Sequence, residues 1–265
     1  MSGAVDTPDD VVLQTRGLVK RFGGITATNN VSMIIRRGAR HALIGPNGAG
    51  KTSLINQLTG MLAPSEGRVL LGGRDITTLA PHKRVALGLV RTFQINQLFA
   101  TLTPLQSLAL AVASRRDRAR RWWAPMGTDA QINLECEQLL AQFRLIDFAD
   151  RATSELPYGK RRLLEIALAV AQKPSVLLLD EPAAGVPGPE RADILATVAA
   201  LPADVSVVLI EHDMDLVFSF AKTLTVLVNG TVLTEGTPEQ IAADPQVRAV
   251  YLGDSVPARP GAGHG

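Results

Sequence analysis

The most informative segment of this chain is Gly45-Pro46-Asn47-Gly48-Ala49-Gly50-Lys51-Thr52, followed by Ser53. It fits G-x-x-x-x-G-K-[ST], the pattern of a phosphate-binding loop. The glycines allow successive backbone N–H groups to turn toward one anion, the Lys51 ammonium reaches outer phosphates, and the Thr52 hydroxyl is a ligand for Mg²⁺. We therefore expect residues 45–53 to bind a polyphosphate.

The residues on either side of the loop support this prediction. Residues 41–44 indicate a short strand before it, and Leu54, Leu58 and Met61 recur at helical spacing after it. A loop between a strand and a helix places the anion at a helix N-terminus. There the helix dipole and the unpaired N–H groups add affinity for negative charge.

The composition is that of a globular protein without disulfides. The 265 residues are 46% hydrophobic, which fits one domain or a domain with a subdomain. A net charge of +2 is too small to indicate a nucleic acid partner, and the single Cys136 favours a reducing compartment. The sequence has neither an apolar run of 18 residues nor an apolar N-terminal signal. We expect a cytoplasmic chain that does not cross a membrane unaided.

The order of predicted elements defines an α/β fold. Residues 11–40 alternate loosely between turn signals and predict two or three strands before the loop, and residues 67–71 predict another. From about 98 to 160 the pattern is helical. We expect a P-loop NTPase core with a mixed sheet, an N-terminal antiparallel β subdomain and an inserted α-helical subdomain. The domain should span 11–253, between a disordered N-terminus (1–10) and a disordered tail (254–265).

The predicted helical insertion carries a basic stretch. Residues 115–121 contain five arginines and one aspartate, and Trp122 and Trp123 follow. Two interpretations stay open: a solvated cationic helix face with packing tryptophans, or a contact with a partner or with membrane headgroups.

Two apolar runs end in acids. Residues 176–179 are closed by Asp180-Glu181, and residues 205–210 by Glu211-His212-Asp213. Buried parallel strands have this form, and ligands of open α/β sheets gather at the carboxyl ends of the strands. We expect Asp180 to bind Mg²⁺, Glu181 to orient and deprotonate the attacking water, and His212 to hydrogen-bond the terminal phosphate.

Two local signals mark the C-terminal part. Asn229-Gly230 between apolar runs predicts a two-residue hairpin turn. Thr237-Pro238-Glu239-Gln240 predicts the start of a helix, with a capping box and proline at the first position.

Together, these motifs resemble those of the ATPase subunits of ATP-binding cassette (ABC) transporters, from about residue 11 to 253. Gln94 in Arg91-Thr92-Phe93-Gln94 is similar to the family's Q-loop glutamine, and Leu156-Pro157-Tyr158-Gly159-Lys160 is similar to its signature. The resemblance implies ATP and Mg²⁺ as ligands, with Gln94 beside Thr52 and Asp180 at the metal. It implies catalytic roles for Glu181, His212 and Gln94.

The resemblance also implies how partners assemble. Phe22 falls where the family stacks an aromatic ring on adenine. Tyr158 and Gly159 begin a helix whose N-terminus is a second anion site, which in the family meets the ATP of a second cassette in a head-to-tail dimer. That second subunit is the same chain or a paralogue, and separate membrane permease subunits dock near residues 94–105.

Three passages are most similar to subunits of branched-chain and hydrophobic amino acid importers and their relatives for amides and urea: residues 158–167, 181–185 and 211–218. An importer also implies a substrate-binding protein outside the membrane. Two alternatives stay open: the ATPase of a lipopolysaccharide-type exporter, and a nucleotide-dependent regulator that hydrolyses ATP slowly. The single cassette and short insertion argue against DNA-repair and translation-factor relatives.

Two positions depart from the family pattern. Pro157 stands where the signature usually has serine, and Pro187 stands where Asp or Asn is common. The first removes a hydroxyl and a backbone donor to the partner's phosphate, so we expect slower turnover.

Overall fold

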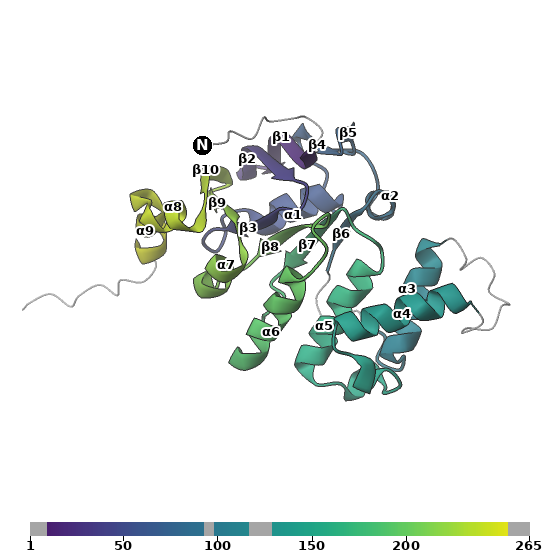
Figure 1. Cartoon of the computed structure of the whole chain (residues 1–265). Helices are drawn as coiled ribbons and strands as arrows, with labels where there is room; N and C mark the ends of the chain where they lie inside the picture. Colours follow the sequence, from purple (N-terminus) through teal and green to yellow (C-terminus); the bar gives the residue numbers. More distant parts are fainter. Residues whose placement is uncertain (1–9, 93–97, 117–128, 254–265) are drawn as a thin grey trace, which may run out of the picture.

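The computed structural model describes residues 10–92, 98–116 and 129–253 (Figure 1). Several predictions lie outside the described residues: the disorder of both ends, Gln94, and the tryptophans and most arginines of the basic stretch.

Two sheets form the frame of the molecule. The first is antiparallel, in the order β2-β1-β4-β5, and comprises β1 (Val11–Phe22), β2 (Ile25–Arg36), β4 (Glu66–Leu71) and β5 (Arg74–Asp75). This confirms the predicted antiparallel β subdomain.

The second sheet has the order β10-β9-β3-β8-β7-β6. Its strands are β3 (Arg40–Ile44), β6 (Leu89–Arg91), β7 (Val176–Asp180), β8 (Ser206–Ile210), β9 (Thr223–Val228) and β10 (Thr231–Gly236). All pair in parallel except β10, which pairs antiparallel with β9. The sheet is therefore mixed, as predicted.

Helices flank this sheet. In chain order they are α1 (Lys51–Thr59), α2 (Pro81–Ala86), α3 (Pro104–Arg115), α4 (Ala130–Gln142), α5 (Tyr158–Val170), α6 (Gly188–Ala199), α7 (Met214–Phe220), α8 (Pro238–Ala243) and α9 (Pro245–Gly253), with short 3-10 turns at Ile146–Phe148 and Thr153–Glu155. Figure 1 shows α3, α4 and α5 together on one side of the molecule, with α8 and α9 on the opposite side.

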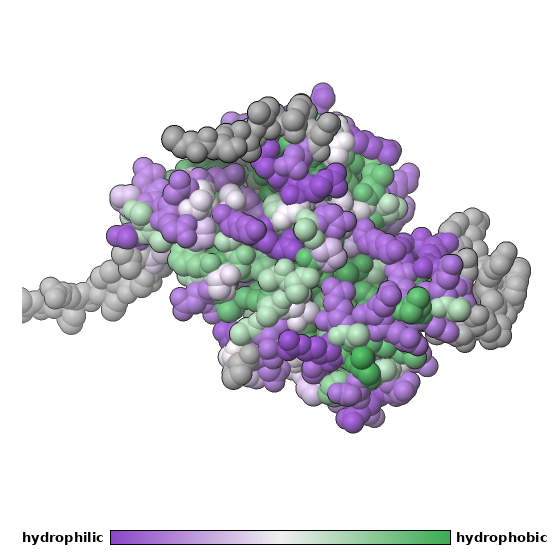
Figure 2. Space-filling model, viewed as in Figure 1, coloured by the Kyte–Doolittle hydropathy of each residue, from purple (hydrophilic) through white to green (hydrophobic). Residues whose placement is uncertain are grey.

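The core has two clusters because the central strands are buried on both faces. Leu177 and Leu179 of β7 belong to the cluster that includes residues of α3 to α7, whereas Leu178 belongs to the cluster between the two sheets around α1. This explains the continuous apolar run that predicted a parallel strand. In Figure 2 hydrophilic residues cover most of the visible face, and a pale apolar band crosses its middle.

Local sequence signals gave several elements correctly and one residue wrongly. Asn229 and Gly230 both have positive φ, as a type I′ turn requires, and Thr237 forms the expected capping box with Gln240. Met61, however, is not on α1. The helix ends at Thr59 because Gly60 adopts a left-handed cap, and Met61 is 60% exposed. In the described part of the chain no helix is both long and apolar enough to span a bilayer.

Candidate functional site

The phosphate loop joins β3 to α1, in the strand–loop–helix context that the sequence predicted. Gly50 is the N-cap of α1 with φ 99, and a Cβ there would lie 2.3 Å from the Ala27 carbonyl oxygen. Only glycine fits this turn. Lys51 folds back over the loop, and its Nζ donates to the carbonyl oxygens of Gly45 (2.6 Å) and Pro46 (3.0 Å). The Lys51 ammonium group is thus held by two carbonyls of its own loop.

Three charged side chains meet at this loop. Burial lowers the pKa of Lys51, whereas the nearby carboxylates of Glu181 and Asp180 raise it. The two acids at the end of β7 therefore lie near enough to the phosphate loop to act on the charge of Lys51. A bound polyanion, or a reversed charge at one of these residues, would therefore shift the pKa values of Lys51, Asp180 and Glu181 together.

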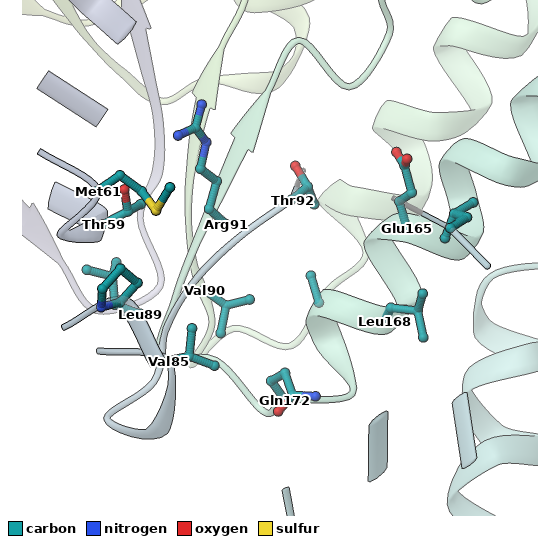
Figure 3. A pocket seen from close by; sticks show the side chains of 13 residues that line it. Thr59, Met61, Val85, Leu89, Val90, Arg91, Thr92, Glu165, Leu168 and Gln172 are labelled. Atoms are coloured by element: carbon teal, nitrogen blue, oxygen red, sulfur yellow. The ribbon is translucent and has the colours of Figure 1, made fainter. Parts of the chain in front are cut away.

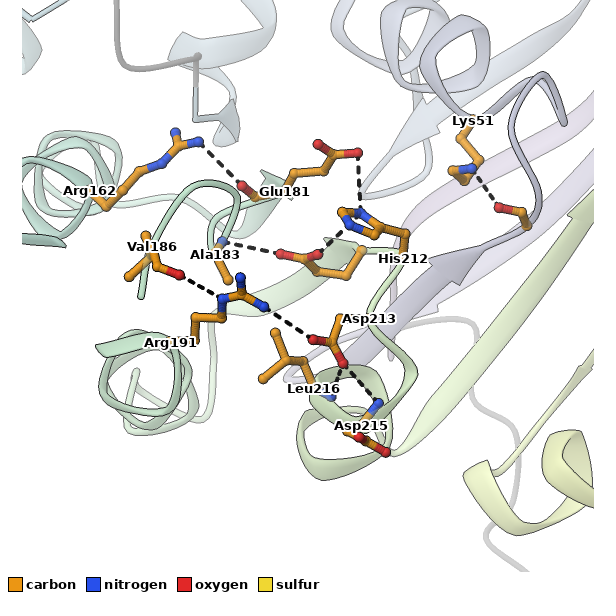
Figure 4. Close-up of polar contacts among 12 residues, drawn as sticks. Lys51, Arg162, Glu181, Ala183, Val186, Arg191, His212, Asp213, Asp215 and Leu216 are labelled. Carbon is orange, nitrogen blue, oxygen red and sulfur yellow. Dashed lines mark hydrogen bonds and ion pairs between the residues drawn. The ribbon is translucent and has the colours of Figure 1, made fainter. Parts of the chain in front are cut away.

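Glu181 follows β7 directly and has an unusual backbone. Its φ is 47, in the left-handed region, and its N–H donates to the Ile210 carbonyl at 2.9 Å. A non-glycine residue keeps such a conformation only when its surroundings hold it. Its carboxylate is half-exposed, and Oε1 lies 3.7 Å from Nδ1 of His212 (Figure 4). The structure thus brings together the predicted acid and the predicted histidine.

Glu211 is a third acid of this site, and the sequence analysis gave it no role. Its side chain is 2% exposed, its Oε1 accepts from the Ala183 N–H at 3.1 Å, and its Oε2 lies 3.8 Å from His212 Nδ1. Burial raises the pKa of Glu211. Its position at the end of an apolar strand, like that of Asp180, was a signal that could have identified it.

The side chains available for Mg²⁺ are oxygen donors. Thr52 lies exposed in the first turn of α1, and Asp180 is partly exposed at the end of β7. A hydroxyl and a carboxylate that leave room for phosphate oxygens suit Mg²⁺, which is usually held by one or two carboxylates and substrate phosphates. The residues present therefore fit the ion. Asp180 is also paired with Arg91, a contact that the sequence did not reveal.

The remaining predicted residues lie farther apart. Phe22 is 50% exposed at the end of β1, with Lys20 Nζ 5.2 Å from its ring. Tyr158 and Gly159 occupy the first turn of α5, and within the described residues no hydrogen bond joins them to residues 45–53. The second half of the predicted Q-loop lies outside the described residues.

Further contacts tie neighbouring elements to the site. Arg191 of α6 donates from Nε to the Val186 carbonyl (2.7 Å), and its Nη1 lies 3.5 Å from Asp213, which caps α7 (Figure 4). Tyr251 of α9 has a hydrogen bond with the backbone of Gly45, while burial raises its pKa to about 12. The contacts Arg191–Asp213 and Tyr251–Gly45 join residues too distant in the chain for a local pattern to indicate them.

Comparison with known protein families gives two matches. The family described as "ABC transporter" matches residues 28–184. The family described as "Branched-chain amino acid ATP-binding cassette transporter" matches residues 231–257.

Individual relatives are similar over nearly the whole chain. The high-affinity branched-chain amino acid transport ATP-binding protein BraF of Pseudomonas aeruginosa is 40% identical over 253 residues, covering 92% of this chain and 98% of BraF. LivG of Escherichia coli, a protein of the same description, is 36% identical over 252 residues, with the same two coverages. The solved ADP conformation of MJ1267, an ATP-binding cassette of an ABC transporter, has a TM-score of 0.81 and 32% identity, covering 92% of this chain and 99% of MJ1267.

Proposed function

Because the chain belongs to the ABC transporter family, as an ATP-binding subunit that hydrolyses ATP, we propose that it drives import of branched-chain amino acids through separate membrane permease subunits. The observation that carries this proposal is the similarity to BraF over 92% of the chain. The match of residues 231–257 supports it independently, because this segment follows the part matched by the general family. Exporter and regulator alternatives are not favoured by these relatives.

We propose that residues 45–53 hold the phosphates of ATP through backbone N–H groups. Lys51 would exchange its two carbonyl partners for outer phosphate oxygens, since its ammonium already lies over the loop. An ammonium that exchanges neutral carbonyls for anionic oxygens gains a stronger, charge-assisted bond. Phe22, exposed at the end of β1, would stack on the adenine.

We propose that Thr52 and Asp180, with Gln94, hold Mg²⁺, which when bound would neutralise charge that develops on the phosphates. Glu181 would accept a proton from the attacking water. His212, whose Nδ1 lies near Glu181, would orient that carboxylate and donate a hydrogen bond to the terminal phosphate. The strained backbone at Glu181 fits a residue held in place for catalysis.

We propose that ATP joins two cassettes head to tail, with the α5 N-terminus at Tyr158 and Gly159 meeting the nucleotide of the partner. Pro157, the N-cap of α5, makes no side-chain capping bond to the first turn, and the Glu190 carboxylate lies beside Gly159 there, where the partner's phosphate would have to take its place. The second cassette is either the same chain or a paralogue.

An apolar groove between α5 and β6 is the surface that we propose for the permeases. It is lined by Met61, Val85, Leu89, Leu98 and Leu168, with Arg91 and Glu165 on its walls (Figure 3). Leu98 belongs to the segment 94–105 where the resemblance places permease docking. An apolar permease segment would fill the groove and hold the cassette at the cytoplasmic face of the membrane, with a substrate-binding protein on the other side.

The experiment that tests this function has two parts. Lys51→Ala should weaken Mg·ATP binding by at least about tenfold, the loss of one charge-assisted contact, and Glu181→Gln should abolish phosphate release while ATP still binds. Lys83→Ala, an exposed lysine of α2, is the control. In vesicles holding the copurified permeases, ATP should drive leucine uptake. Full ATP affinity in Lys51→Ala, or copurification with proteins other than amino acid permeases, would contradict the proposal.

A further inference from the structure

The helix α5 makes two hydrogen bonds to the 181–186 loop of its own subunit. The Tyr158 hydroxyl donates to the Ala184 carbonyl at 3.0 Å, and Arg162 Nη2 donates to the Glu181 carbonyl at 3.4 Å. Tyr158 and Arg162 lie four residues apart, on one face of the helix. One helix face therefore holds the loop at both the catalytic acid and a residue three positions beyond it.

Both the loop and the core constrain the position of the Tyr158 side chain. Gly185 has φ 72, and a Cβ there would lie 2.8 Å from the Tyr158 hydroxyl. The loop thus leaves room for the phenol only because residue 185 is glycine. Tyr158 is half-buried and packs against the main core cluster, so its ring has little freedom to leave.

Arg162 is a buried cation whose ion-pair partner lies on its own helix. It is 6% exposed and pairs with Glu165 of the same helix at 2.8 Å. A buried ion pair seldom stabilises a fold more than apolar residues of similar volume would. Its Nε has no protein partner among the described residues, whereas Nη2 reaches the carbonyl of Glu181. The pair therefore presents an N–H group to the catalytic loop (Figure 4).

The other contacts of the loop come from the core side. The Glu181 N–H donates to Ile210, the Ala183 N–H to Glu211, and Arg191 donates to Val186. These anchors fix the loop to β8 and α6. Within the described residues, the hydrogen bonds of Tyr158 and Arg162 are the ones that join the loop to α5, the helix whose N-terminus would meet the partner's nucleotide.

We propose that Tyr158 and Arg162 are positioning residues that link the N-terminus of α5 to Glu181 within one subunit. This inference rests on the proposed head-to-tail dimer. ATP of the partner would hold the first turn of α5, and the hydroxyl of Tyr158 and the guanidinium of Arg162 would then hold Glu181 in its catalytic position. Occupancy of one nucleotide site thereby raises the hydrolysis rate at the other.

The test compares two variants with a matched control. Tyr158→Phe removes the hydroxyl and keeps the ring, and Arg162→Met with Glu165→Leu removes the buried N–H groups without leaving an unpaired charge. Thr153→Val is the control, because it also loses a buried hydroxyl bond to a backbone carbonyl, at Leu102 (2.7 Å), away from the loop. Phosphate release, ATP affinity and melting temperature are measured for each.

Tyr158→Phe and the double variant should each lower kcat about fivefold, the effect of one lost hydrogen bond, and reduce the Hill coefficient for ATP. ATP affinity should stay within about twofold of wild type, and melting temperature should fall no more than in Thr153→Val, which keeps its kcat. An unchanged kcat in both variants would overturn the inference. The inference would also be overturned if Thr153→Val lost as much kcat as the two variants for the same fall in melting temperature.

A further experiment tests whether Tyr158 positions Glu181 or itself contacts the partner's nucleotide. In a Glu181→Gln background, Tyr158→Phe should leave ATP-dependent dimerisation unchanged, as followed by size-exclusion chromatography. Loss of that dimerisation would mean that the phenol binds the partner's nucleotide, and would overturn the inference. Lys51→Ala in the same assays reports on the proposed function separately: if it binds ATP normally, the proposed function fails, whatever Tyr158→Phe does.

Discussion

Arg91 and Asp180 form an ion pair in which Nη2 lies 2.5 Å from Oδ2, and the two side chains are only 15% and 23% exposed. The same guanidinium donates from Nη1 to Asn56 of α1 at 2.8 Å. The carboxylate that we propose for Mg²⁺ is therefore already in contact with a cation. Arg91, in β6, thus connects this strand with β7 and with α1, and it also lines the proposed permease groove.

Arg91→Gln should lower the Mg²⁺ concentration needed for half-maximal ATP binding several-fold, because it removes the cation that competes for Asp180. The variant should also lose about 1–2 kcal/mol of unfolding free energy in the absence of nucleotide, through the lost charged hydrogen bond. Titration of Mg²⁺ at fixed ATP in a Glu181→Gln background measures the first effect. Arg144→Gln, which removes an exposed ion pair with Asp193, is the control. A higher Mg²⁺ requirement in Arg91→Gln would mean that Arg91 instead holds Asp180 ready for the metal.

Pro157→Ser should raise the ATPase rate. Pro157 is the N-cap of α5 and offers no side-chain capping bond, so serine would add a hydroxyl and an N–H where the partner's phosphate is expected. A hydrogen bond to a charged group contributes about 1.5–3 kcal/mol. Phosphate release by wild type and variant at saturating ATP decides the matter, with the melting temperature as a check on folding. An unchanged or slower rate would count against the proposed contact.

Arg84→Met should destabilise the fold by about 3–5 kcal/mol, because four backbone carbonyls each lose a charged donor. The Arg84 side chain is 1% exposed, and its guanidinium donates to four of them: Gln57, Leu58, Thr77 and Leu79. Two of these carbonyls end α1, so the loss should loosen the helix behind the phosphate loop. Urea unfolding gives the difference, and Lys83→Met on the exposed side of α2 is the matched control. Equal stability of the two variants would show that water replaces the guanidinium.

His41→Gln should remove part of the loss of stability in acid. Burial lowers the pKa of His41 from 6.5 to about 4, and its Nε2 lies 2.8 Å from the Thr225 hydroxyl. Between pH 6.5 and 4 the unfolded chain binds a proton that the folded chain does not, so wild type loses up to about 3 kcal/mol as pH falls through this window. Glutamine keeps an N–H at the same place but does not titrate.

Urea unfolding at pH 7.5, 6 and 5 measures this slope in wild type and in His41→Gln. His82→Gln, at an exposed histidine of α2, is the control and should keep the wild-type slope. Identical slopes in His41→Gln and wild type would show that His41 is not the titrating group.

Local patterns in the sequence predicted many of the strands, turns and helix starts correctly. The apolar run before Asp180, the Asn229-Gly230 turn and the capping box at Thr237 each correspond to an element of the structure. Met61 was misplaced because the periodicity continued past Gly60, whose left-handed conformation ends α1. Periodicity alone does not show where a backbone changes direction.

The phosphate loop, the strand-end acids and several strands could be predicted from the sequence alone, because turn chemistry and side-chain periodicity act between residues a few positions apart. The order of the strands in the two sheets could not. The pairing of Arg91 with Asp180, 89 positions away, and of Tyr158 with Ala184, 26 positions away, became visible in the folded chain. An arginine or tyrosine can bond to any acceptor that packing brings near it. Which acceptor it bonds to depends on which elements pack together in the folded chain, where water is partly excluded, and no local preference of the sequence encodes that choice.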